Sequence, residues 1–204
     1  MENKDQIPRQ TKGAQTDTQH SVSFGNENEA ISNYQEAKNR LFNVSKWHSY
    51  AGSGTADFQL ADSNGEPVFR PARQGDHFRI NIPGPGLKTG DGEDWVQIEN
   101  IGEVDEMNSN RAYIVVRPAT NPLNTKSDTA HFFKDEATST FIIRRDGNTV
   151  SAEVHGRNEL PNTENESLID KARNVVVALG AMAGMSKLQW GALTRGLIDP
   201  QIKD

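Results

Sequence analysis

The segment TSTFIIRRDGNTVSAEVHGR, residues 138–157, predicts a β-hairpin. Two runs of alternating side chains flank the pair Asp146-Gly147, which we place at the two central positions of the turn. Such a pair is a strong hairpin signal, because both central residues of a type I′ turn need a positive φ. In this register Ile143 faces Val150, so the hairpin presents one apolar face.

The opposite face of the hairpin carries a polar row, Glu153, His155 and Arg157. A carboxylate, an imidazole and a guanidinium at a spacing of two could support general acid–base chemistry. The alternative is a sheet face that lies in water, and we favour it. The sequence therefore assigns no catalytic residue.

Other segments in the middle of the chain alternate with the same period of two. Because successive side chains of a strand point to opposite faces, this pattern predicts antiparallel strands with one face on a core and one in water. The apolar members of these segments are Phe58 and Leu60; Phe78, Ile80 and Ile82; Val96 and Ile98; and Ala112, Ile114 and Val116. A short edge strand at residues 67–69 is a further expectation. We predict a mostly antiparallel sheet of about six strands.

Helical patterns flank this region on both sides. Apolar residues recur at spacings of three and four between residues 27 and 46, with Asn26 or Asn28 as the cap. A second helical region extends from a capping box at Thr163 and Glu166 and continues in a last helix that ends before Pro200. The predicted fold class is α+β, with the sheet covered on one face by the N-terminal and C-terminal helices.

Residues 1–26 are mostly polar, and their few apolar residues are isolated. Such a segment buries too little surface to offset the entropy of ordering, so we expect a disordered tail. The domain organisation predicted from the sequence is a disordered tail over 1–26 and a single α+β domain over 27–200.

Composition excludes several classes of function. The net charge of −6 and the pI near 5.4 argue against binding to nucleic acid or to an anionic membrane. No apolar run reaches the roughly 20 residues of a membrane span, and the N-terminus has no apolar stretch of a secretory signal, so we expect a cytoplasmic protein. The chain has no cysteine, and its five histidines form no close ligand pair. We expect neither a metal nor a cofactor.

Two long loops, residues 82–93 and 118–130, are candidates for a functional role. Aromatic residues adjoin them, and these either line an apolar cavity or form part of the core. Our candidate ligand-binding residues at the cavity or its mouth are Trp95, Arg117 and His131. The segment RNELPN, 157–162, is either a cluster of donors and acceptors at a pocket or a joint between strand and helix, and we favour the joint.

The order of elements, together with the aromatic segment from Trp47 to Tyr50, resembles the START-like (SRPBCC, helix-grip) superfamily. The resemblance covers about residues 25–200. It implies a curved sheet that wraps a long C-terminal helix and encloses a hydrophobic cavity. The glycines at 180 and 184 depart from the continuous helix of that superfamily. The chain also resembles an uncharacterised bacterial family, which implies no function.

We therefore expect a binding protein for a small, largely apolar ligand, held in a cavity between the sheet and the C-terminal helix. The alternative is a protein–protein interaction or assembly module, with the tail or loop 82–93 as the docking element. A hydrolase or cyclase would need a polar constellation inside the cavity.

Overall fold

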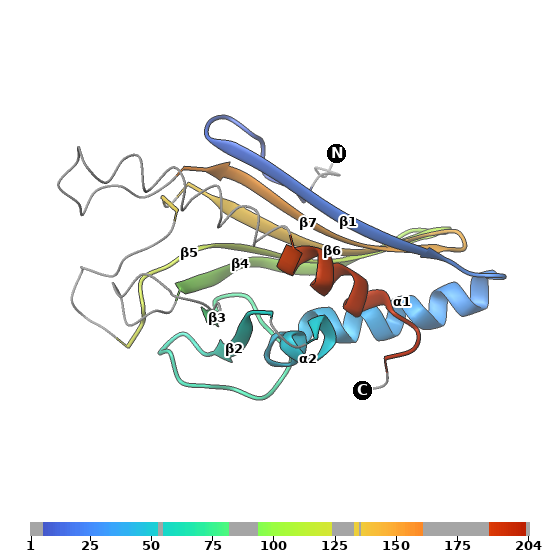
Figure 1. The fold of residues 1–204 in the computed structure, drawn as a ribbon, viewed down its shortest axis with the longest axis horizontal. Coiled ribbons are helices and arrows are strands. Elements are labelled where there is room, and N and C mark those ends of the chain that lie inside the picture. The colour runs from blue at the N-terminus through green and yellow to red at the C-terminus, as the bar shows by residue number, and fades with distance from the viewer. Residues whose placement is uncertain are drawn as a thin grey trace.

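A seven-stranded antiparallel sheet, in the order β1-β7-β6-β5-β4-β3-β2, forms the framework of the molecule (Figure 1). The computed structural model describes residues 6–52, 55–81, 94–123, 133–134, 136–160 and 188–202. The strands are β1 (Ala14–Ser23), β2 (Asp57–Ala61), β3 (His77–Asn81), β4 (Asp94–Asp105), β5 (Ser109–Pro118), β6 (Thr138–Asp146) and β7 (Thr149–Glu159). The helices are α1 (Glu27–Phe42), α2 (Trp47–Ala51) and an unlabelled last helix, 188–198, with a 3-10 turn at Val44–Lys46.

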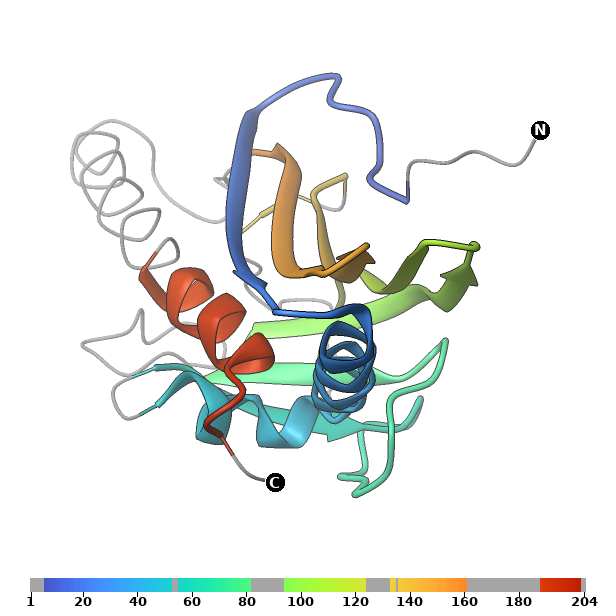
Figure 2. The ribbon, with the colours of Figure 1, turned by 90° about the vertical axis from the view of Figure 1, so that its right-hand side faces the viewer.

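The helices lie on one face of this sheet, as the sequence predicts (Figure 2). The helix-facing side is apolar, and its strand residues include Phe58, Phe78, Ile114 and Phe141. Period-two alternation puts the polar side chains of the same strands on the other side, which we call the outer face. The predicted α+β fold class is confirmed, with one strand more than the six expected.

The 138–157 hairpin is present, but its register differs from the prediction by two residues. Asp146 pairs with Thr149 and Arg145 with Val150, so the turn residues are Gly147 and Asn148. Only Gly147 has a positive φ, 56°, as expected at the first central position of a type II′ turn. A shift of two residues leaves every side chain on the face predicted for it, because the strand period is also two.

The prediction of a disordered tail over residues 1–26 is wrong over its central part. Residues Ala14–Ser23 form β1, which pairs with β7 from Ala14 opposite Glu159 to Ser23 opposite Thr149. The segment is too polar to show an apolar face in the sequence. It forms a strand because its backbone pairs with that of β7. Removing residues 1–26 would therefore strip an edge strand from the sheet. A single domain over 27–200 stays a prediction.

Two smaller expectations have different outcomes. The predicted N-cap of α1 is confirmed at Asn26, whose side chain accepts a hydrogen bond from Glu29 N at 3.0 Å. The edge strand expected at residues 67–69 is reduced to an isolated bridge between Ala61 and Pro67. The capping box at Thr163 and Glu166 lies outside the described residues.

Side chains of α1 hold the carboxyl end of helix 188–198. Arg40, only 1 % exposed, donates from Nη1 to Leu197 O at 3.3 Å and Asp199 O at 2.9 Å, and from Nη2 to Ile202 O at 2.6 Å. Asn33 Nδ2 donates to Ile198 O at 3.1 Å. The last carbonyl groups of a helix have no N–H partner within the helix, and the carboxyl end carries a partial negative charge. A buried guanidinium therefore binds there favourably.

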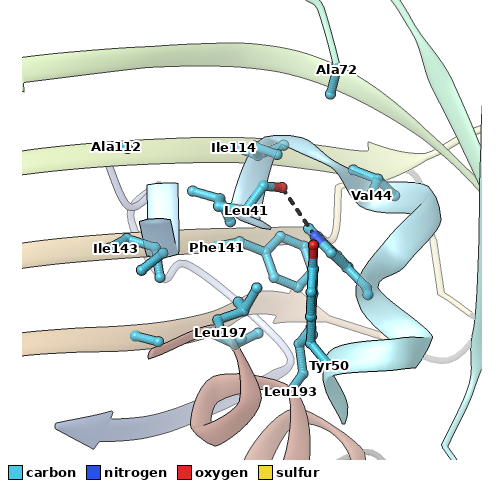
Figure 3. Close-up of a cluster of buried hydrophobic side chains, with 14 of the residues drawn as sticks. Leu41, Val44, Tyr50, Ala72, Ala112, Ile114, Phe141, Ile143, Leu193 and Leu197 are labelled. Carbon is cyan, nitrogen blue, oxygen red and sulfur yellow. Dashed lines mark hydrogen bonds between the residues drawn. The ribbon is translucent and has the colours of Figure 1, made fainter. Parts of the chain in front are cut away.

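A close approach of backbones locks the same helix against α2. A Cβ built on Gly196 would overlap the carbonyl group of Tyr50. Only glycine fits at that contact. Leu193 and Leu197 of the helix then reach the sheet residues Ile114 and Phe141 in the core between the layers (Figure 3).

Replacing Arg40 with methionine should destabilise the protein by about 3 kcal/mol or more, because three carbonyls lose a charged, buried donor. Urea unfolding followed by circular dichroism measures this free energy. Lys38→Met is the matched control on the same helix. Lys38 pairs with Glu103 at the surface, and its loss should cost less than about 1 kcal/mol. Equal costs for the two variants would contradict this role of Arg40.

Gly196→Ala and Gly191→Ala should change stability in opposite directions. Alanine at 196 meets the Tyr50 backbone and should cost about 1–3 kcal/mol or more. A Cβ at Gly191 meets no atom within 4 Å, so the higher helix propensity of alanine should stabilise by up to about 1 kcal/mol. Thermal melting of both variants checks the signs. A stabilised Gly196→Ala would contradict the close approach.

Candidate functional site

Aromatic rings from the helices and the sheet meet on the helix-facing side. Trp47 of α2 lies 4.7 Å from Phe141, 5.3 Å from Phe58 and 5.7 Å from Phe78, measured between ring centroids. Its Nε1 donates to Arg40 O and Leu41 O, so the indole is fully buried without an unpaired donor. Tilted and edge-on contacts at these distances favour a well-packed core over an open cavity at this point.

Trp190 of helix 188–198 joins this cluster from the other side. Its ring centroid lies 5.4 Å from that of Phe141 and 6.1 Å from that of Phe58. Unlike Trp47, Trp190 is only partly buried. The cluster therefore ends at an aromatic side chain whose surface the described residues leave partly uncovered.

Two aliphatic residues continue the apolar surface beyond the cluster. Ile80 is the cross-strand partner of Phe58, and Val96 is the partner of Phe78. Both are partly buried and pack against the core. We call Ile80, Val96 and Trp190 the apolar rim. Cross-strand neighbours lie within side-chain contact, so the rim and the cluster form one continuous apolar surface.

The residues singled out from the sequence lie elsewhere. The strand register places Trp95 opposite Arg79 and Arg117 opposite Gln97, on the outer face. Trp95 is 4 % exposed and its Nε1 has no hydrogen-bond partner among the described residues, whereas Arg117 Nε donates to Glu99 at 2.7 Å. His131 lies outside the described residues. The ligand-binding role of these three residues stays a prediction. The apolar rim was not predicted, because alternation shows which residues share a face of a strand but not how far other elements bury them.

The polar row of the hairpin does not lie in water, contrary to our interpretation of the sequence. Glu153 is 7 % exposed and Arg157 is 8 % exposed. His155 Nε2 lies 2.9 Å from Glu153 Oε2, and its Nδ1 lies 2.5 Å from Oδ1 of Asp17 on β1. Arg157 also donates to Asp17 Oδ1, at 2.7 Å. Asp17 could not be found from the sequence, because it was assigned to the disordered tail.

Charges on β6 and β7 complete this network. Ser151 Oγ donates to Glu153 Oε1 at 3.0 Å. Arg144 Nε lies 3.3 Å from the same oxygen, close enough for an ion pair but not aligned for a hydrogen bond. We call Asp17, Arg144, Glu153, His155 and Arg157 the ion network. Each buried charge in it has a partner of opposite sign, as burial demands.

The ion network shifts the pKa values of its members. Burial opposes ionisation of Asp17, but hydrogen bonds from Gln15, His155 and Arg157 outweigh it and lower the pKa to about 2. Burial likewise opposes ionisation of Glu153, yet His155, Arg144 and Ser151 hold its pKa below the usual value. For His155, burial lowers the pKa, and the hydrogen bonds with Glu153 and Asp17 raise it further than burial lowers it.

This arrangement fits a structural role better than catalysis. A general base needs a free ring nitrogen within reach of a substrate proton. Both nitrogens of His155 lie against carboxylates, and only the doubly protonated ring can donate to both. The Glu153, His155 and Arg157 row therefore holds two strands together.

A shallow depression of about 330 Å³ lies beside the ion network on the outer face. Its lining is polar and consists of Gln19, Ser21, Arg144, Asp146, Thr149, Ser151 and Glu153. Hydroxyl, amide and charged groups do not suit an apolar ligand.

The segment 157–162 is described only as far as residue 160, so a joint between strand and helix stays a prediction, and Asn158 has a different role. Its backbone adopts a left-handed conformation, φ 57°. Its Oδ1 accepts hydrogen bonds from Thr11 N at 2.8 Å and Lys12 N at 3.3 Å, and its Nδ2 donates to Arg9 O at 3.1 Å. The side chain thus binds residues about 147 positions away rather than its own turn.

The described residues also bear on metal binding and on membrane insertion. Among the described residues, no group of three or more His, Asp or Glu side chains is placed to hold a metal ion. In the same part of the chain, no helix is long and apolar enough to cross a membrane.

No protein-family model matches the chain, and no curated protein matches its sequence significantly. Its fold is similar to solved structures of bacterial and plant proteins. One is TTHA0849 from Thermus thermophilus, with 11 % identity, a TM-score of 0.47, and coverage of 91 % of this chain and 95 % of that one.

Two plant proteins are similar in the same way. Truncated norcoclaurine synthase from Thalictrum flavum has 8 % identity, a TM-score of 0.42 and coverage of 96 % and 100 %. Major latex-like protein 151 from Panax ginseng has 14 % identity, a TM-score of 0.37 and coverage of 94 % and 100 %. The superfamily resemblance drawn from the order of elements stays a prediction. At these identities and scores, no ligand and no activity is transferred to this chain.

Proposed function

We propose that the protein binds a small, largely apolar ligand between the helix-facing side of the sheet and the C-terminal helix. The observation that carries the proposal is the apolar rim of Ile80, Val96 and Trp190, which the described elements cover only in part. Apolar surface left open beside a closed core is what a ligand of matching chemistry would bury.

The rest of the fold favours this location. The contacts of Arg40 and Gly196 hold helix 188–198 against α1 and α2, so the position of Trp190 does not depend on a ligand. A preformed site loses little free energy to ordering when it binds. The depression described on the outer face is polar, which suits water and hydrophilic molecules.

If a ligand co-purifies with the protein, native mass spectrometry of gently purified protein should show a mass above that of the chain. Denaturation should remove this extra mass. Calorimetric titration with palmitate, and separately with the fluorescent probe 1-anilinonaphthalene-8-sulfonate, tests the site directly. Both probes have a large apolar part and should bind the folded wild-type protein with a defined stoichiometry.

Val96→Trp should weaken binding of these probes by about tenfold or more, equivalent to about 1.4 kcal/mol, because the indole fills the space beside the rim. The matched control is Val104→Trp, the same substitution on the same strand. Val104 is 37 % exposed and pairs with Arg111 outside the apolar cluster, so its variant should bind as the wild type does. Absence of probe binding to wild type, or equal affinities of the two variants, would contradict the proposal.

A further inference from the structure

The N-terminal residues form a separate element on the sheet. We call residues 6–23 the strap. It consists of β1, which lies at the edge of the described sheet beside β7, and of residues 6–13, which turn just before the first residue of β1 (Figure 2). The turn is held by Asn158 through Arg9, Thr11 and Lys12, as described above.

The strap covers an apolar cluster on the outer face. Tyr113, Val115 and Ile142 are 9 %, 6 % and 1 % exposed, and they form a cluster distinct from the main core. Within the described residues, the apolar side chain packed against them is Ile7 of the strap. Detaching the strap would therefore bring apolar surface into contact with water.

His155 connects the strap to the sheet through both ring nitrogens. Nδ1 faces Asp17 of the strap, and Nε2 faces Glu153 of β7. With two protons, the imidazolium donates two charge-assisted hydrogen bonds, which are the strong kind. With one proton, one nitrogen turns a lone pair toward a carboxylate, and a favourable contact becomes a repulsive one.

The other polar groups around His155 do not replace this contact. On the strap, Gln15 Nε2 donates to Asp17 Oδ2. On β7, Arg157 donates to Asp17 Oδ1 and Thr16 O, and the Glu159 carboxylate accepts from Thr16 Oγ1. On β6, Arg144 pairs with Glu153, and Thr140 lies opposite His155, its hydroxyl without a partner in the described part of the chain. Arg157 keeps its pair with Asp17 and Arg144 its pair with Glu153, but none of these groups bridges the two carboxylates as the imidazolium does.

We propose that the proton on His155 controls whether the strap stays closed over Tyr113, Val115 and Ile142. The protonated ring holds β1 against β7. The neutral ring releases that contact, the strap opens more often, and the apolar cluster becomes accessible. This device is independent of the ligand site proposed above, which lies on the other side of the sheet.

The pH range of closure follows from the directions of the shifts. The pKa of His155 is raised in the folded protein, so its contribution is fully present below the unfolded value of 6.5 and is lost as pH rises through the raised value. The pKa of Asp17 is lowered to about 2, so its contribution is present above 3.8 and is lost as pH falls toward 2. The strap is held best between these limits.

A cysteine at position 115 measures opening of the strap, because the natural chain has none. The rate at which a thiol reagent labels Val115→Cys is measured at each pH. It is divided by the rate for Met107→Cys, a position that is 95 % exposed. This ratio removes the effect of thiol ionisation on the rate. Between pH 6.5 and pH 9 this ratio of labelling rates should rise by about tenfold or more. A change of that size is expected when one charge-assisted hydrogen bond that holds the strap closed is lost.

Adding His155→Gln should raise the ratio at pH 6.5 and remove its pH dependence. His20→Gln, on the neighbouring strand β1 but outside the ion network, should leave the pH dependence intact. Hydrogen exchange of the wild-type chain gives a check without variants: amides of β1 should lose protection relative to those of β6 on going from pH 6.5 to pH 9. A constant ratio, unchanged protection, or a pH dependence that survives in His155→Gln would overturn the proposal.

Discussion

The position of the last helix depends on one buried guanidinium. Arg40 is almost fully buried. Moving a guanidinium out of water is unfavourable unless hydrogen-bond acceptors take up its N–H groups. The carbonyls of Leu197, Asp199 and Ile202 meet that requirement, so the end of the chain can lie in few other places. The approach of Gly196 to Tyr50 and the contacts of Trp190 with the sheet both follow from this placement.

The two faces of the sheet carry side chains of different kinds. The helix-facing side is apolar and ends in a rim that an apolar ligand could bury. The outer face carries the ion network and a small apolar cluster beneath the strap. The same alternation of side chains produces both faces, so a single hairpin contributes Phe141 to one and His155 to the other.

Period-two and helical patterns predicted the elements well, because both are properties of neighbouring residues. The faces of the hairpin were correct even though its register was not, since Asp146-Gly147 and Gly147-Asn148 are both acceptable turns and differ by two in pairing. β1 was missed for a related reason. It has no apolar stripe, and its order comes from β7, with Asp17 meeting His155 138 residues later in the chain.

Apart from β1 and the bridge at Pro67, local sequence thus specified which of the described residues form helices and strands and which side chains share a face, because periodicity and turn chemistry act over a few residues. It could not specify that Glu153 and Arg157 are buried, that Asn158 binds residues 9–12, or that Val96 and Trp190 belong to one rim. Those properties arise when distant segments pack together, and burial and pairing depend on the partner as much as on the residue.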